Sequence, residues 1–248
     1  MRDFHGKTYW LIGASAGLGA ELARGLSKRG AHLILSARDE ESLRQLADSL
    51  DGPAEIAPLD VSDPASIDAA AATFGVPDGL VYLAGVYWPL SAAEWNPDQV
   101  EAMADINFSG ALRCLGRVLP QMIARDAGHI VITGSLSGFR GLPGSLGYGA
   151  SKAACMYLAE SLHADLAGTG VDVQLVNPGF IRTRLTDKND FTMPFIMEPG
   201  EAAALYLRHM ETQRFTRNFP RVFSWAFRLS RLLPDSLYYR FFTAATAR

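Results

Sequence analysis

The sequence predicts a doubly wound α/β fold, in which one parallel sheet lies between two layers of helices (α/β/α) and a C-terminal helical extension follows. Short, nearly continuous apolar runs alternate with longer segments of helical periodicity over the first 180 residues. Strands of a parallel sheet give such runs because helices cover both of their faces. Repeated strand–helix–strand units imply right-handed crossovers between neighbouring strands.

Six strands and the helices between them follow in order along the chain. The strand-like runs are residues 8–12, 32–36, 55–59, 79–83, 129–133 and 172–176. Helices are expected at 18–28, at 40–50, from Pro64 onward, and near 107–125 and 150–168. Gly30 suits the C-terminal end of the first helix, and Asp63 with Pro64 suits the N-cap and first turn of the third.

Composition excludes several classes of protein. With 248 residues, 48% of them hydrophobic, and a net charge of −3, the chain can bury a large core and is not disordered in general. Cys114 and Cys155 are the two cysteines, and both lie in apolar stretches. They predict small core residues in a reducing compartment, not a disulfide scaffold. Without a targeting pattern or a long apolar stretch, we expect a cytoplasmic protein.

Charge is distributed unevenly along the chain. Residues 1–207 carry 15 basic and 24 acidic side chains, whereas residues 208–248 carry eight arginines and two acidic residues. The acidic body argues against nucleic-acid binding, because such proteins present a basic surface. No linker or repeat interrupts the chain, so we expect one domain over 1–210 with 211–248 as its basic, amphipathic helical extension.

Three glycines stand between the first strand and the first helix. Gly13 permits a tight turn, Gly17 lets the backbone approach a pyrophosphate, and Gly19 allows close packing of helix and strand. The phosphates would lie at the helix N-terminus, where free N–H groups favour anions. Because a strand precedes the turn and a helix follows it, the pattern predicts a Rossmann-type dinucleotide site rather than a purely structural turn.

The second strand ends in Ser36-Ala37-Arg38, nineteen residues after Gly19. An acidic residue here would bind the adenosine ribose hydroxyls of NAD(H), whereas an arginine suits the 2′-phosphate of NADP(H). Ser15 can add a hydroxyl to that phosphate. We therefore expect NADP(H) to be preferred over NAD(H), although the adjacent Asp39 leaves the other choice open.

Tyr148 and Lys152 stand four residues apart at the start of a long helical segment. This spacing places both side chains on one helix face. A neighbouring ammonium group stabilises a phenolate, so we expect Lys152 to lower the pKa of Tyr148 from its usual value of about 10. Without further motifs, a tyrosine and a lysine four residues apart on a helix are more often a surface pair than a catalytic one.

Taken together, these motifs resemble the short-chain dehydrogenase/reductase family in its compact, NADP-preferring form, over roughly residues 7–185. Besides the glycine turn and the Tyr-x-x-x-Lys pair, the family motifs match Asn107, Ser135, Asp60-Val61, Asn177-Pro178-Gly179 and Thr183. The resemblance implies a catalytic tetrad of Asn107, Ser135, Tyr148 and Lys152. It implies cofactor contacts at Gly13, Ser15, Ala16, Gly17, Leu18, Gly19, Arg38, Asp60, Val61, Ala84, Gly85, Tyr148, Lys152, Pro178, Gly179, Ile181 and Thr183.

The resemblance also implies an activity. An oxidoreductase of this family interconverts a carbonyl group (ketone, aldehyde or 3-oxoacyl) and the alcohol. In the expected reduction Tyr148 protonates the alkoxide, Ser135 binds the carbonyl oxygen, Lys152 binds the nicotinamide ribose, and Asn107 positions a water. A cofactor-binding scaffold with weak catalysis is the alternative, although such a protein is expected to lose tetrad residues.

Two positions depart from the family pattern. Ile12 stands where a threonine usually precedes the first glycine, and Tyr82-Leu83-Ala84-Gly85 stands in place of Asn-Asn-Ala-Gly. Both changes put larger apolar groups at strand ends beside the cofactor. We expect binding to survive because Ala84 and Gly85 still allow a close approach.

Two stretches are expected to border the substrate, because ligands of open α/β sheets bind outside the carboxyl ends of the strands. Residues 86–90 follow the fourth strand, and residues 182–198 follow the sixth and have the length of a mobile lid. The apolar content of the second stretch favours an apolar carbonyl or alcohol substrate. Packing of the same residues into the core is the competing interpretation.

The C-terminal extension departs from the glycine-rich ending of compact family members. A seventh strand is expected in 214–219, then an amphipathic helix over 221–233 with an Arg/Ser stripe, and a second segment over 236–245 that holds Tyr238, Tyr239, Phe241 and Phe242. Three roles remain open: packing on the same domain or a partner subunit, peripheral contact with an anionic membrane, and walling of the substrate pocket.

We expect a homo-oligomer, most simply a dimer formed through the two long helices. The five histidines show no spacing typical of a metal site, so no metal is expected. Ser135 lacks the Gly-x-Ser-x-Gly context of a hydrolase nucleophile.

Overall fold

Seven parallel strands form one sheet in the computed structural model, which describes residues 1–246 and their side chains as far as Arg240. The strands are β1 (Thr8–Ile12), β2 (His32–Ser36), β3 (Ala54–Ile56), β4 (Gly79–Tyr82), β5 (Gly128–Thr133), β6 (Val171–Pro178) and β7 (Thr216–Phe219). Their order across the sheet is β3-β2-β1-β4-β5-β6-β7. The chain therefore reverses its direction of winding between β1 and β4, where doubly wound folds bind ligands.

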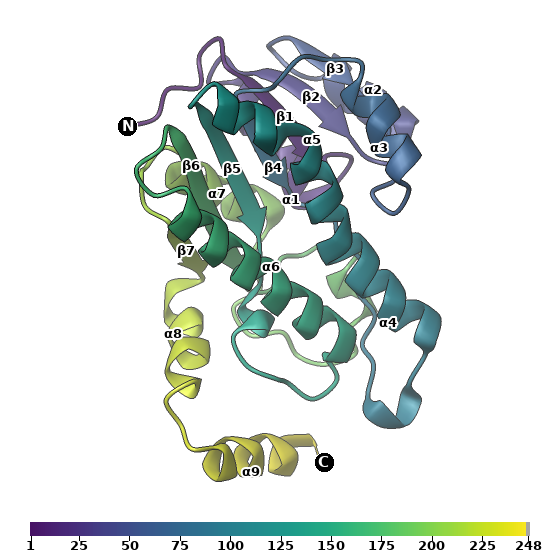
Figure 1. The fold of residues 1–248 in the computed structure, drawn as a ribbon. Helices are drawn as coiled ribbons and strands as arrows, with labels where there is room; N and C mark the ends of the chain where they lie inside the picture. Colours follow the sequence, from purple (N-terminus) through teal and green to yellow (C-terminus); the bar gives the residue numbers. More distant parts are fainter. Residues whose placement is uncertain (247–248) are drawn as a thin grey trace.

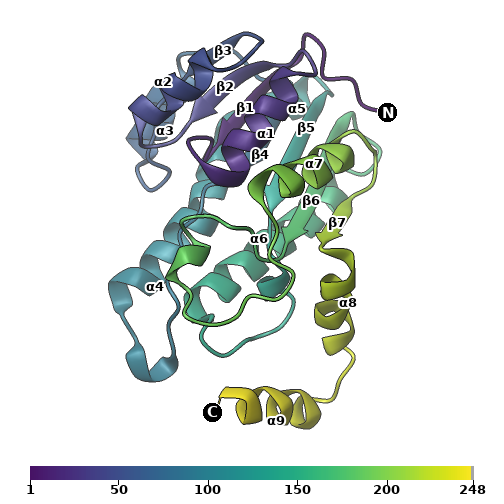
Figure 2. The same cartoon turned by 180° about the vertical axis from the view of Figure 1, so that it is seen from behind.

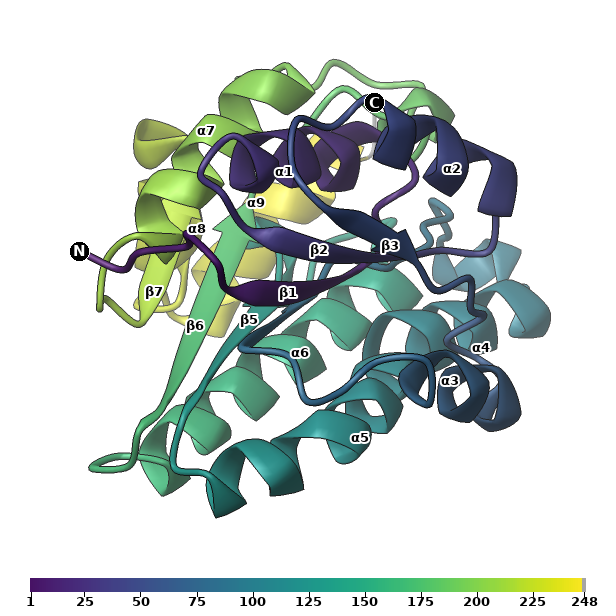
Figure 3. The ribbon, with the colours of Figure 1, turned by 90° about the horizontal axis from the view of Figure 1, so that it is seen from above.

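Helices cover both faces of the sheet, so the expected three-layer fold is confirmed (Figure 3). One layer holds α1 (Gly17–Ser27), α2 (Glu40–Asp48) and α7 (Pro199–Met210), and the other holds α3 (Pro64–Ala71), α4 (Pro97–Ala104), α5 (Gly110–Ala124) and α6 (Leu146–Asp165). Each layer has its own apolar core against the sheet. The strand residues alternate between these cores, as Trp10 and Leu11 of β1 do.

Local signals in the sequence account for several element boundaries. Asp63 caps α3 by accepting a hydrogen bond from the Ala65 amide at 2.9 Å, and Pro64 occupies the first turn. The third strand ends at Ile56 and is shorter than the expected 55–59. The amides of Ala57 and Leu59 still donate to the Leu35 and Ala37 carbonyls, so the chain continues alongside β2 beyond the end of the strand.

The C-terminal extension begins within the sheet. β7 pairs in parallel with β6 at the sheet edge, and α8 (Arg221–Ser230) and α9 (Asp235–Thr246) then run past the carboxyl ends of the strands (Figure 1). The side chains of Phe241 and Phe242 lie outside the described residues. Among residues 1–246, no helix combines the length and the hydrophobicity needed to cross a membrane.

The orientation of α8 differs from the one its Arg/Ser stripe suggests. Ser224 is buried and donates its hydroxyl to the Arg221 carbonyl, whereas Val222, Trp225 and Leu229 are 72%, 46% and 52% exposed. Phe223 lies on the inner side with Ser224 and packs against Phe195 of the segment after β6, and Phe227 packs edge-on to Phe223. The helix thus turns one apolar face inward and leaves a second one exposed.

Candidate active site

The glycine turn lies at the carboxyl end of β1, at the centre of the sheet. Gly13 has φ +94° and Gly17 has φ +54°, conformations that L-residues rarely adopt. A Cβ atom on Gly13 would lie 2.6 Å from the Ala84 nitrogen, and one on Gly17 would lie 2.9 Å from the Thr183 methyl group. The segments that follow β1, β4 and β6 therefore lie in close contact here. Only glycine at positions 13 and 17 leaves room for this approach.

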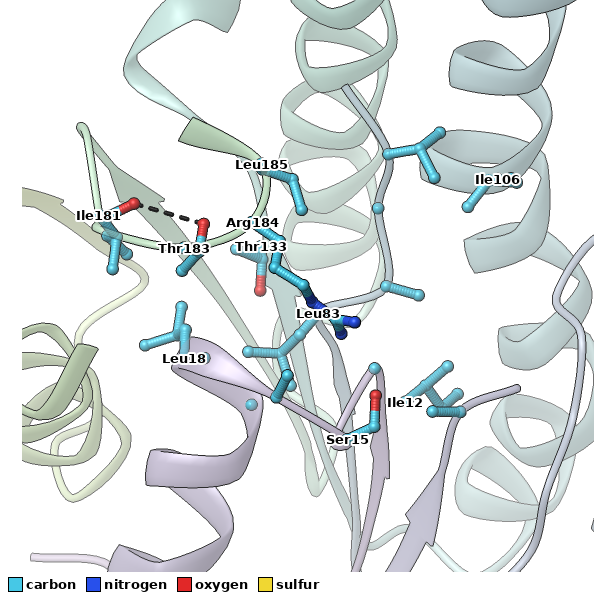
Figure 4. Close-up of a pocket in the computed structure, with 18 of the residues that line it drawn as sticks. Ile12, Ser15, Leu18, Leu83, Ile106, Thr133, Ile181, Thr183, Arg184 and Leu185 are labelled. Carbon is cyan, nitrogen blue, oxygen red and sulfur yellow. Dashed lines mark hydrogen bonds between the residues drawn. The ribbon is translucent and has the colours of Figure 1, made fainter. Parts of the chain in front are cut away.

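These segments surround a hollow of about 970 Å³. Its volume is at the upper end of the range for small-molecule and cofactor sites. All of the residues expected to bind the cofactor line it: Gly13, Ser15, Ala16, Gly17, Leu18, Gly19, Arg38, Asp60, Val61, Ala84, Gly85, Tyr148, Lys152, Pro178, Gly179, Ile181 and Thr183. Figure 4 shows Ser15 and Leu18 on one side of the hollow and Thr183 on the other. The glycine cradle and the long hollow fit a dinucleotide.

Arg38 and Asp39 lie at one end of this hollow, after β2. Asp39 is the N-cap of α2, where its carboxylate accepts hydrogen bonds from the Ser42 amide at 3.1 Å and the Ser42 hydroxyl at 2.6 Å. These bonds hold the pKa of Asp39 below its usual value. Because capping already engages the Asp39 carboxylate, Arg38 is the side chain at this end with donors left for a ligand.

Tyr148 and Lys152 lie at the other end of the hollow, on the first turns of α6. The Lys152 side chain is buried, and its Nζ donates to the Thr133 carbonyl at 2.9 Å. That nitrogen lies 5.9 Å from the centre of the Tyr148 ring. The predicted spacing of the pair is therefore present, although the ammonium group is bonded to β5 and not to the phenol.

The pKa of Tyr148 departs from the sequence-based expectation. Removal of the phenol from water raises its pKa to about 12, and a hydrogen bond with Ser135 opposes this rise without cancelling it. Lys152 was expected to lower that pKa, but the net shift is upward. Burial also lowers the pKa of Lys152 itself.

Ser135 caps a short 3-10 turn, Leu136–Gly138, directly after β5. Its Oγ accepts hydrogen bonds from the Ser137 amide at 3.2 Å and the Ser137 hydroxyl at 3.0 Å. With both acceptor positions filled, the Ser135 O–H is oriented away from its own turn. Ser135 and Tyr148 are therefore neighbours, as the expected tetrad requires.

Asn107 lies in a π-helical turn, Asp105–Ser109, that precedes α5. Its side-chain amide donates to the Val86 carbonyl and the Ser151 hydroxyl, both at 3.0 Å, and its Oδ1 accepts from the Val86 amide at 2.7 Å. π-turns interrupt helices most often at functional sites. Asn107 and Ser135 do not line the hollow; Asn107 instead fixes the chain that follows Gly85.

The two departures from the family pattern have separate structural consequences. Ile12 is buried at the end of β1, and the Tyr82 hydroxyl donates to the Ile106 carbonyl at 2.5 Å. Tyr82 thereby ties β4 to the π-turn that holds Asn107. The Tyr82 hydroxyl fits here because residue 110 is a glycine. A Cβ atom on Gly110 would lie 2.5 Å from that hydroxyl.

The two stretches expected to border the substrate touch each other beside Tyr148. The Tyr87 ring packs edge-on to the Tyr148 ring with centres 5.0 Å apart, and its hydroxyl donates to Asn189 at 2.8 Å. Lys188 donates to the Tyr87 carbonyl at 2.8 Å. The segment between β6 and α7 passes along this side of the molecule (Figure 2).

An aromatic cluster joins that segment to the C-terminal extension. Phe223 of α8 lies 5.9 Å from Phe180 and 5.6 Å from Phe195, and Phe191 lies 5.9 Å from Phe180, measured between ring centres. A Cβ on Gly179 would come within 3.3 Å of Phe223. The extension therefore reaches Gly179, which lines the hollow together with Pro178.

Arg140 binds the extension to the loop that follows Ser135. Its guanidinium donates to the carbonyls of Ser230 and Leu233 and pairs with Asp235 at 2.5 Å. It also lies 3.9 Å from the centre of the Tyr238 ring, whose hydroxyl donates to the Gly141 carbonyl at 2.9 Å. We call these contacts the Arg140 anchor.

Sequence reasoning placed residues 86–90 and 182–198 beside the substrate, but it did not expect the following side chains to line the cofactor hollow. Arg184, Leu185 and Thr186 come from the segment after β6, and Val86, Ile106 and Thr133 come from the other walls. Arg184 is the notable omission because it is charged. Its place directly after Thr183 was the available signal. Within the described part of the chain, no cluster of His, Cys, Asp and Glu is arranged to hold a metal ion.

Comparisons with known proteins agree with this geometry. A family described as short chain dehydrogenase matches residues 7–193. An uncharacterized oxidoreductase of Myxococcus xanthus is 36% identical over 245 residues, which cover 96% of this chain and 97% of that protein. A short-chain dehydrogenase from Sphingobium yanoikuyae in complex with NADPH superposes with a TM-score of 0.81 at 28% identity, covering 87% of this chain and 88% of the other.

A second solved structure shows the same fold with the other cofactor. A short-chain dehydrogenase/reductase from Burkholderia phymatum in complex with NAD superposes with a TM-score of 0.83 at 26% identity, covering 93% of this chain and 95% of that one. Similarity at this level extends over both ends of the hollow.

Proposed function

Because the chain belongs to the short-chain dehydrogenase/reductase family and is an oxidoreductase, we propose that it interconverts a carbonyl compound and its alcohol with NADP(H) as the preferred cofactor. One observation carries the proposal. A single hollow has a glycine cradle in the middle, Arg38 at one end, and Tyr148 with Lys152 at the other. We assign the dinucleotide-binding and catalytic unit to residues 1–210 and its extension to residues 211–248.

The bound cofactor would supply or accept a hydride, and the chain's own residues would manage the proton. Tyr148 donates its phenol proton to the oxygen that becomes the alcohol, since a pKa of about 12 keeps the phenol protonated at neutral pH. Ser135, already bonded to Tyr148, orients the carbonyl oxygen from the other side. Lys152 would hold the nicotinamide ribose, and Asn107 would align the Gly85–Val86 backbone and a water near Lys152.

The preference for NADP(H) rests on charge at the adenosine end. Arg38 offers a planar set of donors that matches a phosphate, and Ser15 lines the same hollow. The competing carboxylate, Asp39, is engaged in capping α2. Replacing Arg38 with Gln should weaken NADPH binding about tenfold to hundredfold, as the loss of a charged hydrogen bond does, and leave NADH binding almost unchanged. Arg44→Gln, on exposed α2, is the matched control.

An apolar substrate fits the surroundings of Tyr148. The Tyr87 ring packs edge-on to the Tyr148 ring, and the Tyr87 hydroxyl is bonded to Asn189 of the lid segment. The same segment carries Phe191 and Phe195, which cluster with Phe180 and Phe223. We propose ketones, aldehydes or 3-oxoacyl compounds with an apolar side chain as substrates.

The decisive experiment measures NADPH oxidation over a panel of ketones, aldehydes and 3-oxoacyl compounds, with NADH as the comparison. The native chain should reduce apolar members of the panel, and Tyr148→Phe should lower kcat by at least a hundredfold with NADPH still bound. Near-native reduction by Tyr148→Phe would refute the role of this phenol. Faster turnover with NADH would refute the assignment of Arg38. NADPH binding without turnover of any compound would favour the scaffold alternative.

The outer face of α8 supports a peripheral membrane contact of a cytoplasmic enzyme. Val222, Trp225 and Leu229 lie on this face, and Arg228 packs its guanidinium 4.5 Å from the Trp225 ring centre. Exposed apolar residues flanked by arginines suit an anionic bilayer surface. Trp225→Ser should reduce co-sedimentation with phosphatidylglycerol vesicles and not with phosphatidylcholine vesicles. Salt-insensitive absence of binding by the native chain would refute the contact.

A dimer through α5 and α6 is proposed for the same enzyme. Tyr157 on α6 is 74% exposed, and Leu112 and Ile123 on α5 are 43% and 48% exposed. Such side chains are commonly covered in oligomers of α/β proteins. Tyr157→Glu should shift the sedimentation coefficient toward the monomer, whereas Trp225→Ser should not.

A further inference from the structure

Arg184 is an exposed cation whose side chain lies inside the hollow (Figure 4). We propose that Arg184 binds a phosphate group of the cofactor and thereby closes the 182–198 segment over it, so that cofactor binding completes the substrate side of the site. This inference rests on the proposed function, because it requires a dinucleotide in the hollow.

The position of Arg184 brings it within reach of phosphate. Arg184 directly follows Thr183, whose methyl group would lie 2.9 Å from a Cβ on Gly17. The segment after β6 is therefore already in contact with the glycine turn at the start of α1. In Figure 4 the Arg184 guanidinium extends from this segment across the hollow toward Leu83 and Ser15. Phosphates bound at the N-terminus of α1 would meet it there.

The charge of Arg184 is not engaged by a hydrogen bond or an ion pair within the described residues. Its neighbours differ: Arg182 pairs with Glu198 at 2.7 Å, and Lys188 donates to the Tyr87 carbonyl at 2.8 Å. A long cationic side chain in a hollow has its five donors available for an anion.

The Arg184 guanidinium lies near the adenosine end of the hollow, where Asp39 is. Arg184 contributes to the lowered pKa of Asp39, after the larger effect of the hydrogen bonds from Ser42. The charge of Arg38 likewise contributes to the lowered pKa of Asp60, and both residues line the hollow. Two guanidinium groups, one from β2 and one from the lid segment, therefore face the space that a cofactor phosphate would fill.

Closure through Arg184 has a consequence for the order of binding. The same segment carries Phe191 and Phe195, which are 49% and 55% exposed and belong to the aromatic cluster with Phe180 and Phe223. An arginine bound to a phosphate would hold this segment down, and its aromatic rings would then border the substrate. We therefore expect the cofactor to bind first and the carbonyl compound second.

The test compares Arg184→Gln, Arg184→Lys and the matched control Arg182→Gln in the full chain. Dissociation constants of NADPH, NADH and 2′,5′-ADP are measured by titration of intrinsic tryptophan fluorescence. Arg184→Gln should weaken NADPH binding about tenfold to hundredfold, Arg184→Lys should restore part of the loss, and Arg182→Gln should stay within twofold of the native chain.

The three ligands identify which phosphate is bound. A loss shared by NADPH and NADH assigns Arg184 to the pyrophosphate, whereas a loss confined to NADPH and 2′,5′-ADP assigns it to the 2′-phosphate. Both outcomes support the proposal. Native affinity of Arg184→Gln for all three ligands, or an equal loss in Arg182→Gln, would overturn it. Failure of the native chain to bind either dinucleotide would instead refute the proposed function.

Closure of the segment is tested independently by chymotrypsin, which cleaves after exposed aromatic residues. Saturating NADPH should slow cleavage at Phe191 and Phe195 in the native chain and in Arg182→Gln. Equal protection in Arg184→Gln, measured with NADPH at saturation for that variant, would overturn the closing role.

Discussion

At the scale of single residues, the site depends on how one phenol is solvated. Burial raises the pKa of Tyr148 to about 12 even though Ser135 bonds to it. Lys152, with its Nζ on the Thr133 carbonyl, does not reverse this effect. The phenol is consequently a proton donor over the whole physiological range, which suits the reduction of a carbonyl group better than the oxidation of an alcohol.

The two reaction directions should therefore differ in pH dependence. In the proposed reaction, reduction uses the protonated phenol, so its kcat/KM should be nearly constant with respect to Tyr148 from pH 6 to pH 10. Oxidation uses the phenolate, whose fraction rises about tenfold per pH unit below the pKa, and its kcat/KM should rise accordingly. A plateau of the oxidation rate near pH 7 would contradict a raised pKa. Tyr87→Phe, which keeps the ring beside Tyr148 and removes the hydroxyl bonded to Asn189, should keep the same slope.

The sequence predicted the residues of the motifs, but it did not predict the pKa shift of Tyr148 or the position of Arg184. Tyr148, Lys152 and the glycines could be predicted because their spacing is fixed by a turn or by one helix face. The sign of the Tyr148 shift could not, because desolvation depends on every atom packed around the phenol. Arg184 directly follows Thr183, which was expected to contact the cofactor, but this place in the sequence does not specify the direction of its side chain.

At the scale of elements, α8 links two parts of the site that are far apart in the sequence. Its inner face carries Phe223, which packs against Phe180 and Phe195. Its far end is held by the Arg140 anchor on the loop after Ser135. The helix thus contacts both the lid segment and the loop that follows Ser135.

Removing the Arg140 anchor should loosen the extension without unfolding the sheet. Arg140→Gln loses its ion pair and ring contact, so trypsin should cleave after Arg221, Arg228 and Arg231 at least tenfold faster than in the native chain. Arg24→Gln, which removes an exposed ion pair with Glu21, is the control and should show native cleavage. Unchanged cleavage in Arg140→Gln would show that the aromatic cluster alone holds α8.

Periodicity predicted the helices well but could not tell which face of α8 would be covered. Apolar residues occupy most of that helix, so its pattern allowed an inward face of either kind. The contacts with Phe180 and Phe195 select the side of Phe223 and Phe227, and Ser224 is buried with them. The third strand ends at Ile56, before the expected Leu59, although the Ala57 and Leu59 amides continue the hydrogen bonds to the chain of β2.

At the scale of the whole molecule, a buried polar network joins inner strands of the sheet toward their amino ends, away from the active site. The His129 ring lies 2.9 Å from the Tyr9 hydroxyl and 3.0 Å from Gln174, and Arg2 donates to it at 2.9 Å. Gln174 in turn donates to the His209 carbonyl. The network joins the N-terminal segment to β1, β5, β6 and α7.

Acid should weaken this network and with it the fold. Burial lowers the pKa of His129 and lowers that of His209 to about 4, so both imidazoles are neutral when folded. In the unfolded chain they bind protons near pH 6.5, so stability is complete above that pH and falls as the pH drops toward 4. The loss is about 1.4 kcal/mol per histidine for each pH unit in this window. Urea unfolding between pH 7.5 and 4.5 measures it.

The acid effect has an internal control. His209→Gln should flatten the dependence of the urea midpoint on pH, whereas His5→Gln, at an exposed position, should leave the slope as it is. A midpoint that is constant between pH 7.5 and 4.5 in the native chain would contradict the assignment of neutral, buried histidines.

The global fold could be predicted because buried parallel strands and right-handed crossovers leave few arrangements. The sheet and its two helix layers are as expected, and β7 extends the sheet into residues assigned to the extension. The His129 network could not be predicted, since it joins residues 2, 9, 129 and 174, whose proximity exists only after the strands have been ordered.

The Arg140 anchor also has a consequence for the order of events during synthesis. The ribosome makes the loop after Ser135 well before it makes Ser230 and Asp235, which hold that loop in place. Domains generally fold from the N-terminal side as the chain emerges, so the sheet and the glycine turn can assemble first. Under the proposed function, a nascent chain could thus take up its cofactor before the extension is made, and we expect premature termination within α8 to leave a protein that binds the dinucleotide but lacks the contacts of α8 with the lid segment.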